Sequence, residues 1–320
     1  MSDRIRGLAL TRAAGSLLGH TDASVESARA LLASARLDRE GSVAVRARDV
    51  RSSAGMDTQR VERELGSILV ERGFTVDLEH PDHELRALFA AGDLARDPAV
   101  DPEDPFDPVT VGTVQCAPEL EDGDRCVLGW TTVRSRRDFG ERVPTDRPFF
   151  QPGSMDPIVA RALANIAGAA PGKLLVDPMC GTGGLLVEAG LIGARTVGVD
   201  AQEKMIRGAR TNLRAYLDGR DSATAWDLLR GDATELPLAD DCADAIVVDV
   251  PYERQSAVAA ASLDDLIEGT LLEAHRIAPR AVLVGDRSWI PAARAAGWDV
   301  ETVARRRVHR SLVRHVHVLD

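Results

Sequence analysis

The stretch LLVDPMCGTGGLL at residues 174–186 decides the fold, because it joins the pattern of a buried strand to a glycine-rich turn and the start of a helix. Its first three residues form a short apolar run, typical of a parallel strand buried on both faces, and Asp177 ends that run. Gly181, Gly183 and Gly184 leave the turn without side chains, and a helix that begins near Gly184 offers unpaired N–H groups and a positive dipole end. We expect an anionic group of a ligand to bind here, although any tight turn from strand to helix also needs glycines.

The spacing of these glycines argues against a dinucleotide site. The dinucleotide fingerprint requires a third small residue where this chain has the bulky Leu186. A site for S-adenosylmethionine instead requires an acid after the first strand, a glycine turn, and a second acid that binds the ribose hydroxyls. Asp200 follows the apolar run at residues 197–199, at the distance expected of a βαβ unit. We therefore predict an S-adenosylmethionine site.

Two further predicted strands also lead into acidic residues. A strand at residues 226–229 is followed by Gly231-Asp232-Ala233, and one at residues 245–248 is followed by Asp249-Val250-Pro251-Tyr252. Ligands of open α/β sheets bind outside the carboxyl ends of the strands, so we expect Asp177, Asp200, Asp232 and Asp249 to share one edge. An acid followed by a small residue, as at Asp232, suits an adenine edge. Each aspartate alone is more often a turn residue or a helix cap.

The length and composition indicate two globular domains. A chain of 320 residues with 44% hydrophobic and 28% charged residues can form two cores. No apolar run is long enough to span a membrane, and the N-terminal sequence lacks the pattern of a secretory signal, so we expect a cytoplasmic location. The four cysteines form no CxxC pair, which predicts no metal site and no disulfide framework, with a Cys116–Cys126 bridge across a hairpin left open.

The net charge of −11 is unfavourable for binding nucleic acid. Lysine occurs only at Lys173 and Lys204, while aspartate is abundant, which is typical of proteins from a high-salt cytoplasm. Repulsion would there be screened within about 3 Å at molar salt. The charge makes a nucleic-acid partner less favoured without excluding it.

The first half of the chain reads as an α+β domain with a linker. We predict helices that begin at Val25 and Val61, the second closed by Gly73, and strands at residues 42–50, 75–78 and 85–89. Residues 91–108 should form an acidic, proline-rich loop, and residues 109–116 and 125–133 a strand pair. Arginines at residues 134–147, with Pro144 and Pro148, indicate a stiff basic linker.

The segment RPFFQPGSM at residues 147–155 should dock, because exposing both Phe149 and Phe150 to water would be unfavourable. It could join the two domains or close over a planar ligand. Helices should follow at residues 158–166 and up to Leu217. Later strands are predicted at residues 281–285, 298–303 and 308–319, with residues 305–307 as a solvated basic turn.

These motifs resemble the THUMP-domain RNA methyltransferases, and most closely the archaeal tRNA guanine-N2 methyltransferases that modify the tenth nucleotide. Residues 177–184 look like the family's cofactor loop, RPFFQPGSM resembles the segment before its catalytic domain, and residues 249–252 resemble its D-P-P-Y motif. Three features depart from the family pattern: Val250 replaces the first proline, Glu253 stands where glycine is common, and the opening strands of the family's N-terminal ferredoxin-like module are not recognised.

The resemblance implies a THUMP-type α+β RNA-binding domain at residues 1–148 and an α/β, Rossmann-like class I methyltransferase domain at residues 149–320. It implies transfer of one or two methyl groups from S-adenosylmethionine to a guanosine N2 amine of tRNA. We expect a cytoplasmic monomer, and the lysine and aspartate usage favours a halophilic archaeon as the source. The implied catalytic residues are Asp249, Pro251 and Tyr252. The implied cofactor-binding residues are Asp177, Met179, Cys180, Gly181, Gly183, Asp200, Ala201, Asp232, Ala233 and Asp249.

Two alternatives to this function stay open from the sequence. D-x-P-Y motifs serve several planar amines, so the target could be an adenine amine or another guanine in RNA. Val250, Glu253 and the acidic composition would also suit a non-catalytic RNA-binding scaffold. Detection of methyl transfer to tRNA distinguishes the scaffold from an enzyme.

Overall fold

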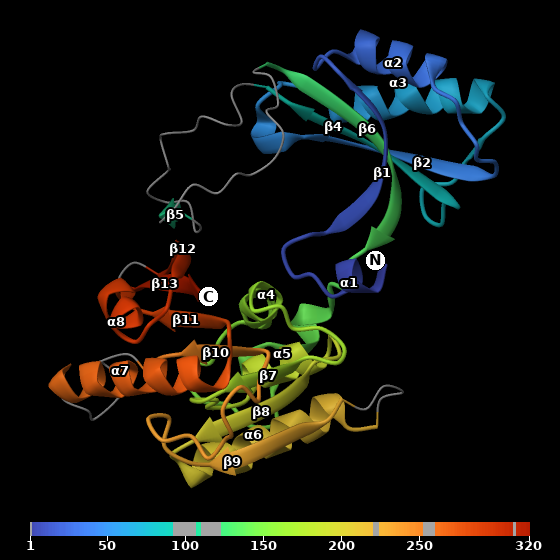
Figure 1. Cartoon of the computed structure of the whole chain (residues 1–320). Coiled ribbons are helices and arrows are strands. Elements are labelled where there is room, and N and C mark those ends of the chain that lie inside the picture. The colour runs from blue at the N-terminus through green and yellow to red at the C-terminus, as the bar shows by residue number, and fades with distance from the viewer. Residues whose placement is uncertain (1, 92–106, 110–122, 220–223, 252–259, 310–311) are drawn as a thin grey trace. The chain divides into compact units, whose positions relative to one another are not determined.

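The computed structural model describes residues 2–91, 107–109, 123–219, 224–251, 260–309 and 312–320 (Figure 1). The chain divides into two compact units. The first contains residues 1–6, 11–99 and 116–135, and the second contains residues 7–10, 100–115 and 136–320. None of the helices within the described ranges has both the length and the apolar character that spanning a membrane requires.

The first unit is an α+β fold with a five-stranded sheet in the order β1-β6-β4-β2-β3. Helices α2 and α3 cover one face of this sheet (Figure 1). Its elements are α1 (Ser2–Arg6), β1 (Ala13–Thr21), α2 (Val25–Ser34), β2 (Ser42–Asp49), the 3-10 helix η1 (Val50–Ser52), α3 (Thr58–Glu71), β3 (Thr75–Val76), β4 (His83–Ala90) and β6 (Arg125–Arg134).

Local sequence signals set the bounds of α3. The Asp57 side chain accepts a hydrogen bond from the Arg60 N–H and caps the first turn. Gly73, with φ of +94°, ends the helix, and the Phe74 N–H donates to the Leu69 carbonyl. The buried face of α3 follows helical spacing, as predicted, and packs on β2.

The second unit is built on an eight-stranded sheet in the order β5-β12-β13-β11-β10-β7-β8-β9. Its strands are β5 (Asp107–Val109), β7 (Leu174–Asp177), β8 (Arg195–Asp200), β9 (Trp226–Arg230), β10 (Ala245–Asp249), β11 (Ala281–Gly285), β12 (Val300–His309) and β13 (Leu312–Leu319). Its helices are η2 (Asp138–Arg142), η3 (Pro144–Asp146), α4 (Pro157–Ile166), α5 (Gly184–Gly190), α6 (Glu203–Leu217), α7 (Ala260–Ile277) and α8 (Ile290–Ala295).

The order of the parallel strands creates a switch point at the centre of this sheet. From β7 the chain continues through β8 and β9 on one side, and then returns to β10 and β11 on the other side of β7. Helices α4, α5 and α6 cover one face, and α7 and α8 cover the other. Ligands of such sheets bind at the carboxyl ends of the strands beside the switch point, here β7 and β10.

The structure contradicts one sequence prediction about strands. Residues 305–307 are not a turn: they continue β12 and pair with residues 313–315 of β13. Of the predicted strand at residues 109–116, only Val109 lies within the described residues, and it pairs with Val303 of β12, whereas β6 pairs with β1 and β4. Cys116 and most of the predicted acidic loop lie outside the described residues.

From residue 136 onward, the predicted basic linker is instead part of the second unit. Arg142 is 1% exposed and donates from Nε to Glu188 of α5 at 2.7 Å, and Arg161 of α4 places Nη2 2.7 Å from the other Glu188 oxygen. Arg147 is also buried. The division between the units falls between residues 135 and 136, earlier than the predicted boundary between residues 148 and 149.

Candidate active site

The turn between β7 and α5 has the conformation that its glycines permit. Gly181 and Gly183 have φ of +50° and +74°, which side chains rarely allow. A Cβ at Gly183 would lie 2.6 Å from Leu213, and one at Gly184 would collide with the Arg147 guanidinium. The loop therefore packs closely against both α6 and the segment before α4.

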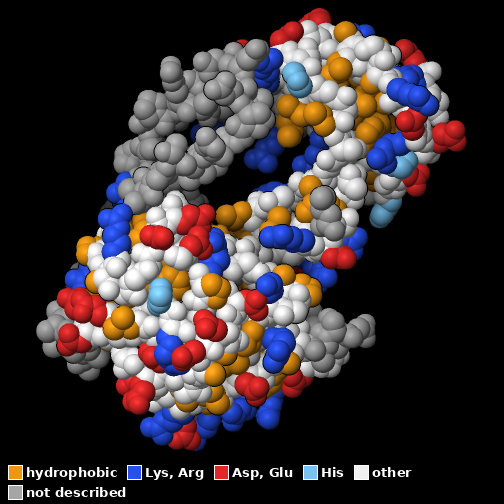
Figure 2. Space-filling view, in the orientation of Figure 1, with side chains coloured by type: hydrophobic (Ala, Val, Ile, Leu, Met, Phe, Trp, Pro, Cys, Tyr) orange, Lys and Arg blue, Asp and Glu red, His pale blue; other side chains and the backbone are white. Residues whose placement is uncertain are grey.

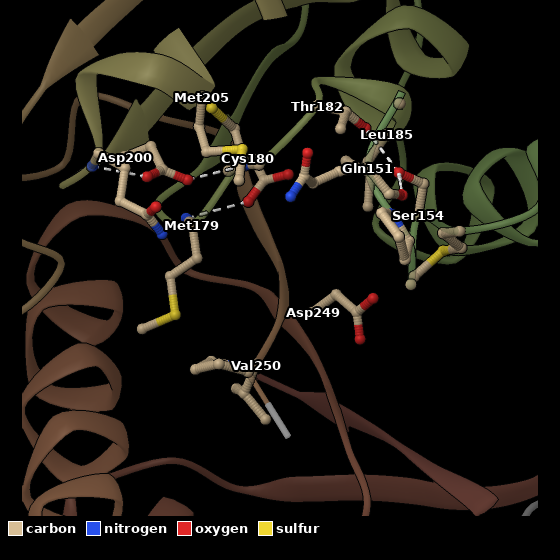
Figure 3. Close-up of a pocket in the computed structure, with 18 residues that line it drawn as sticks. Gln151, Ser154, Met179, Cys180, Thr182, Leu185, Asp200, Met205, Asp249 and Val250 are labelled. Atoms are coloured by element: carbon tan, nitrogen blue, oxygen red, sulfur yellow. Dashed lines mark hydrogen bonds between the residues drawn. The ribbon is translucent and has the colours of Figure 1, made fainter. Parts of the chain in front are cut away.

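A cavity of about 780 Å³ opens beside this turn, at the carboxyl ends of β7, β8 and β10 (Figure 3). It combines apolar side chains with carboxyl groups, as nucleoside sites do. Its lining consists of Gln151, Pro152, Gly153, Ser154, Met155, Asp177, Met179, Cys180, Gly181, Thr182, Gly184, Leu185, Asp200, Gln202, Met205, Asp249, Val250 and Pro251.

Three of the four predicted strand-end acids meet in the cavity. Asp177, Asp200 and Asp249 line it, whereas Asp232 does not and accepts hydrogen bonds from the N–H and hydroxyl of Thr234, both at 2.8 Å. Asp200 accepts the N–H groups of Gly181 at 3.0 Å and Gln202 at 2.8 Å. Asp200, at the end of β8, is thus hydrogen-bonded to the glycine turn that follows β7.

Burial changes the ionisation of two of these acids. Burial raises the pKa of Asp177 to about 8. Repulsion from Asp249 and Asp200 raises this pKa further, whereas a hydrogen bond from the Met179 N–H lowers it. Burial also raises the pKa of Asp200, although its two N–H donors oppose the shift. A cationic ligand group would relieve this repulsion, so the cavity favours a ligand with positive charge.

The segment at residues 147–155 forms one wall of the cavity, and α6 holds it there. Asn212, fully buried in α6, accepts the Phe149 N–H and donates to the Phe149 carbonyl, both at 2.9 Å, and also donates to the Thr182 carbonyl at 2.9 Å. Ser154 and Thr182 place their hydroxyls 3.2 Å apart. The prediction that both phenylalanines dock is only half right, because Phe150 is 42% exposed.

The predicted site residues divide into three groups. Asp177, Met179, Cys180, Gly181, Asp200, Asp249 and Pro251 line the cavity. Gly183, Ala201, Asp232 and Ala233 do not line it, and Tyr252 lies outside the described residues. The sequence analysis missed Gln151, Ser154, Thr182, Gln202 and Met205. The first three belong to motifs it had quoted, whereas Gln202 and Met205 carry no local signal.

Comparison with known proteins agrees with this geometry. Residues 144–316, more than half of the chain, match the family described as "RMKL-like, methyltransferase domain", and residues 22–89 match the THUMP domain. The chain belongs to this methyltransferase family. The resemblance found in the motifs and the predicted fold class are therefore confirmed.

Curated relatives of this methyltransferase cover both of its units. A protein of Methanothermobacter thermautotrophicus named tRNA (guanine(10)-N2)-dimethyltransferase is 32% identical over 83% of this chain and 69% of its own length. A protein of Pyrococcus abyssi with the same name is 27% identical over 88% of this chain and 74% of its own. Among solved structures, TrmN from Thermus thermophilus matches with a TM-score of 0.47 and 22% identity, over 95% of this chain and 81% of that one.

Proposed function

We propose that this methyltransferase transfers one or two methyl groups from S-adenosylmethionine to the exocyclic N2 amine of a guanosine in tRNA, at nucleotide 10. The observation that carries the proposal is the cavity at the switch point, which brings the glycine turn, Asp177, Asp200 and the Asp249-Val250-Pro251 motif together. The names of the two relatives support the substrate and the position.

The residues that line the cavity suit S-adenosylmethionine. Asp177 offers a buried carboxyl group to a cationic ligand, and Asp200 keeps lone pairs for ribose hydroxyls beside its two N–H donors. Met179, Leu185 and Met205 supply apolar surface for a purine. When bound, S-adenosylmethionine supplies an electrophilic methyl group on a sulfonium.

Catalysis must help the guanine amine, because its lone pair is delocalised into the ring. We expect the Asp249 carboxylate and the carbonyl of Val250 or Pro251 to accept the N2 hydrogens, which directs the lone pair toward the methyl group. The N–C bond forms as the S–C bond breaks, the electron pair of the broken bond stays on sulfur, and N2 releases a proton to Asp249 or water. Correct positioning alone can contribute about 7–11 kcal/mol.

The first unit should hold the tRNA while the target base leaves its stack, at a cost of a few kcal/mol. Because aromatic residues make up only 4% of the chain, we expect the RNA to be recognised by its shape and by contacts between arginines and its phosphates. Acidic and basic side chains are mixed over the face shown in Figure 2, so the charge on this face does not mark an RNA site.

Asp249→Asn tests the catalytic role directly. The amide keeps the size and one acceptor oxygen but loses the charge, so we expect single-turnover methyl transfer to saturating tRNA to be abolished, with cofactor affinity nearly intact. Asp244→Asn is the matched control. Asp244 lies just before β10, at the opposite end of the strand from Asp249, and accepts hydrogen bonds from Lys173 and the Leu174 N–H. Full activity in Asp249→Asn would make Asp249 only a cap of the following turn.

Mapping the modified nucleosides of tRNA tests the target base. N2-methylguanosine or its dimethyl form at nucleotide 10 is the expected product. A methylated adenine amine, or another guanine, would favour the alternative that the sequence left open, and absence of methyl transfer with intact cofactor binding would favour a scaffold.

A further inference from the structure

An arginine from the far end of the chain lies beside Asp249. Arg314 of β13 places Nη2 3.4 Å from Asp249 Oδ2, and the two side chains are 9% and 24% exposed. An ion pair screened from water to this degree is stronger and more directional than a surface pair. No local sequence signal connects these two residues.

The register of the sheet explains why they meet. Val247 and Val316 belong to the apolar cluster beneath α4–α6, so Asp249 and Arg314, each two residues away along its strand, lie on that same face. Both lie at the carboxyl edge of the parallel strands, beyond the apolar cluster. Asp177 lies on this face as well, two residues after Leu175 of the cluster.

Arg314 has a second guanidinium beside it. Arg306 of β12 is its register partner. Burial lowers the pKa of Arg306, the Asp156 carboxylate offsets part of this effect, and the like charge of Arg314 adds to it. Asp249 therefore lies between Asp177 on the cofactor side and Arg314 of the β12–β13 hairpin on the other.

This arrangement fixes the direction of the Asp249 carboxylate. The planar, permanently charged guanidinium of Arg314 attracts Oδ2 of this carboxylate, which favours one orientation of the group at the edge of the cavity.

We propose that Arg314 is a positioning residue that orients the Asp249 carboxylate toward the amine of the target base. This inference rests on the proposed function. It assigns to the C-terminal hairpin a part in catalysis that neither the glycine turn nor the D-V-P-Y motif supplies.

A double-mutant cycle in the full chain tests this role. Arg314→Ala should lower the single-turnover rate at saturating tRNA and S-adenosylmethionine on the order of 100-fold, the effect expected of a misplaced catalytic group. The dissociation constant of S-adenosylmethionine should change little, and Arg314→Lys should restore part of the rate. In the residual transfer that Asp249→Asn shows over long incubation, Arg314→Ala should add little further loss, because the two residues act as one unit.

Arg280→Ala is the matched control, since Arg280 pairs with Glu301 and Asp320 at the opposite end of the same strands. It removes an ion-paired arginine but should leave the rate unchanged. An equal rate loss in Arg280→Ala, or an Arg314→Ala effect of the same size with and without the Asp249 carboxylate, would overturn the inference.

A wild-type chain that methylates no tRNA would contradict the proposed function first. The crystal structure of Arg314→Ala then decides the inference separately, because an Asp249 carboxylate that keeps its orientation without Arg314 would overturn it. If Arg314→Ala does not fold, the rate and structure of Arg314→Lys provide the same two readouts.

Discussion

At the scale of single residues, Asp177 shows how a buried carboxyl group couples ligand binding to pH. Its pKa near 8 means that the free protein holds a proton there at neutral pH. The unfolded chain, with a pKa near 3.8, releases that proton much earlier, so this group makes the free protein less stable as pH rises from about 4 to 8. A bound cation favours the carboxylate, so binding should release the proton.

We therefore expect the affinity for S-adenosylmethionine to increase as pH rises from 6 to 7.5, by at most about tenfold per pH unit. Calorimetry in buffers of different ionisation enthalpy should detect the released proton. Asp177→Asn should have a flatter profile, and since the ligand's own titration is common to both proteins, the difference between the slopes reports Asp177. Identical slopes would contradict the assignment.

At the scale of elements, α6 holds the segment at residues 147–155 against the cofactor cavity. Gly208 makes this possible, because a Cβ there would overlap the Phe149 ring. Gly208→Ala should displace Phe149 and the wall that follows it, which weakens cofactor binding and lowers stability by about 1–3 kcal/mol. Binding and thermal unfolding measure the two effects.

The control for this variant is another helical glycine. A Cβ on Gly66 of α3 would meet nothing within 4 Å, so Gly66→Ala should leave cofactor binding unchanged and stabilise its helix by up to about 1 kcal/mol. Unchanged cofactor affinity in Gly208→Ala would show that the wall does not depend on this contact.

Glu188 of α5 is the other element-scale anchor. Glu188→Gln removes the charge that neutralises the buried Arg142 and Arg161, which should destabilise the second unit by about 3–5 kcal/mol. Urea unfolding, with hydrogen exchange of the α4 and α5 amides, measures the loss. Glu203→Gln on α6 breaks only exposed pairs at 3.7 Å and should change stability by less than about 1 kcal/mol. Similar losses in both variants would contradict the role of burial.

At the scale of the whole molecule, cofactor binding and RNA binding should separate. Every residue that lines the cavity belongs to the second unit. A fragment of residues 136–320 should therefore bind S-adenosylmethionine, while its kcat/KM for tRNA should fall far below that of the full chain. Undiminished kcat/KM in the fragment would remove the RNA-binding role from the first unit. Residues 7–10, which pack on the second unit through Asn165 and Arg137, can be added to the fragment if it is unstable.

The sequence predicted those features of the architecture that depend on residues close together in the chain. The glycine turn and the acids after successive strands each lie within a few residues, and three of the four acids share the cavity. Asn212 contacts Phe149, which lies 63 residues earlier in the chain, and Arg314 of β13 contacts Asp249 of β10. A short window of sequence therefore never contains both partners of either contact. Residues 305–307 read as a turn because three adjacent arginines suit solvent, whereas pairing with β13 places them in a strand.

The place of β13 in the sheet has a consequence for biosynthesis. It lies between β11 and β12, although it follows every other strand of the sheet in the chain. During translation the ribosome therefore releases the cofactor loop and the Asp249 motif long before the strand that completes their sheet. The first unit can fold while synthesis continues. The edge of β11, however, stays unpaired until β13 is synthesised, and until then it is exposed to chaperones or to other nascent chains. A nonsense codon just before β13 would thus yield a product fated for degradation rather than a slightly shortened enzyme.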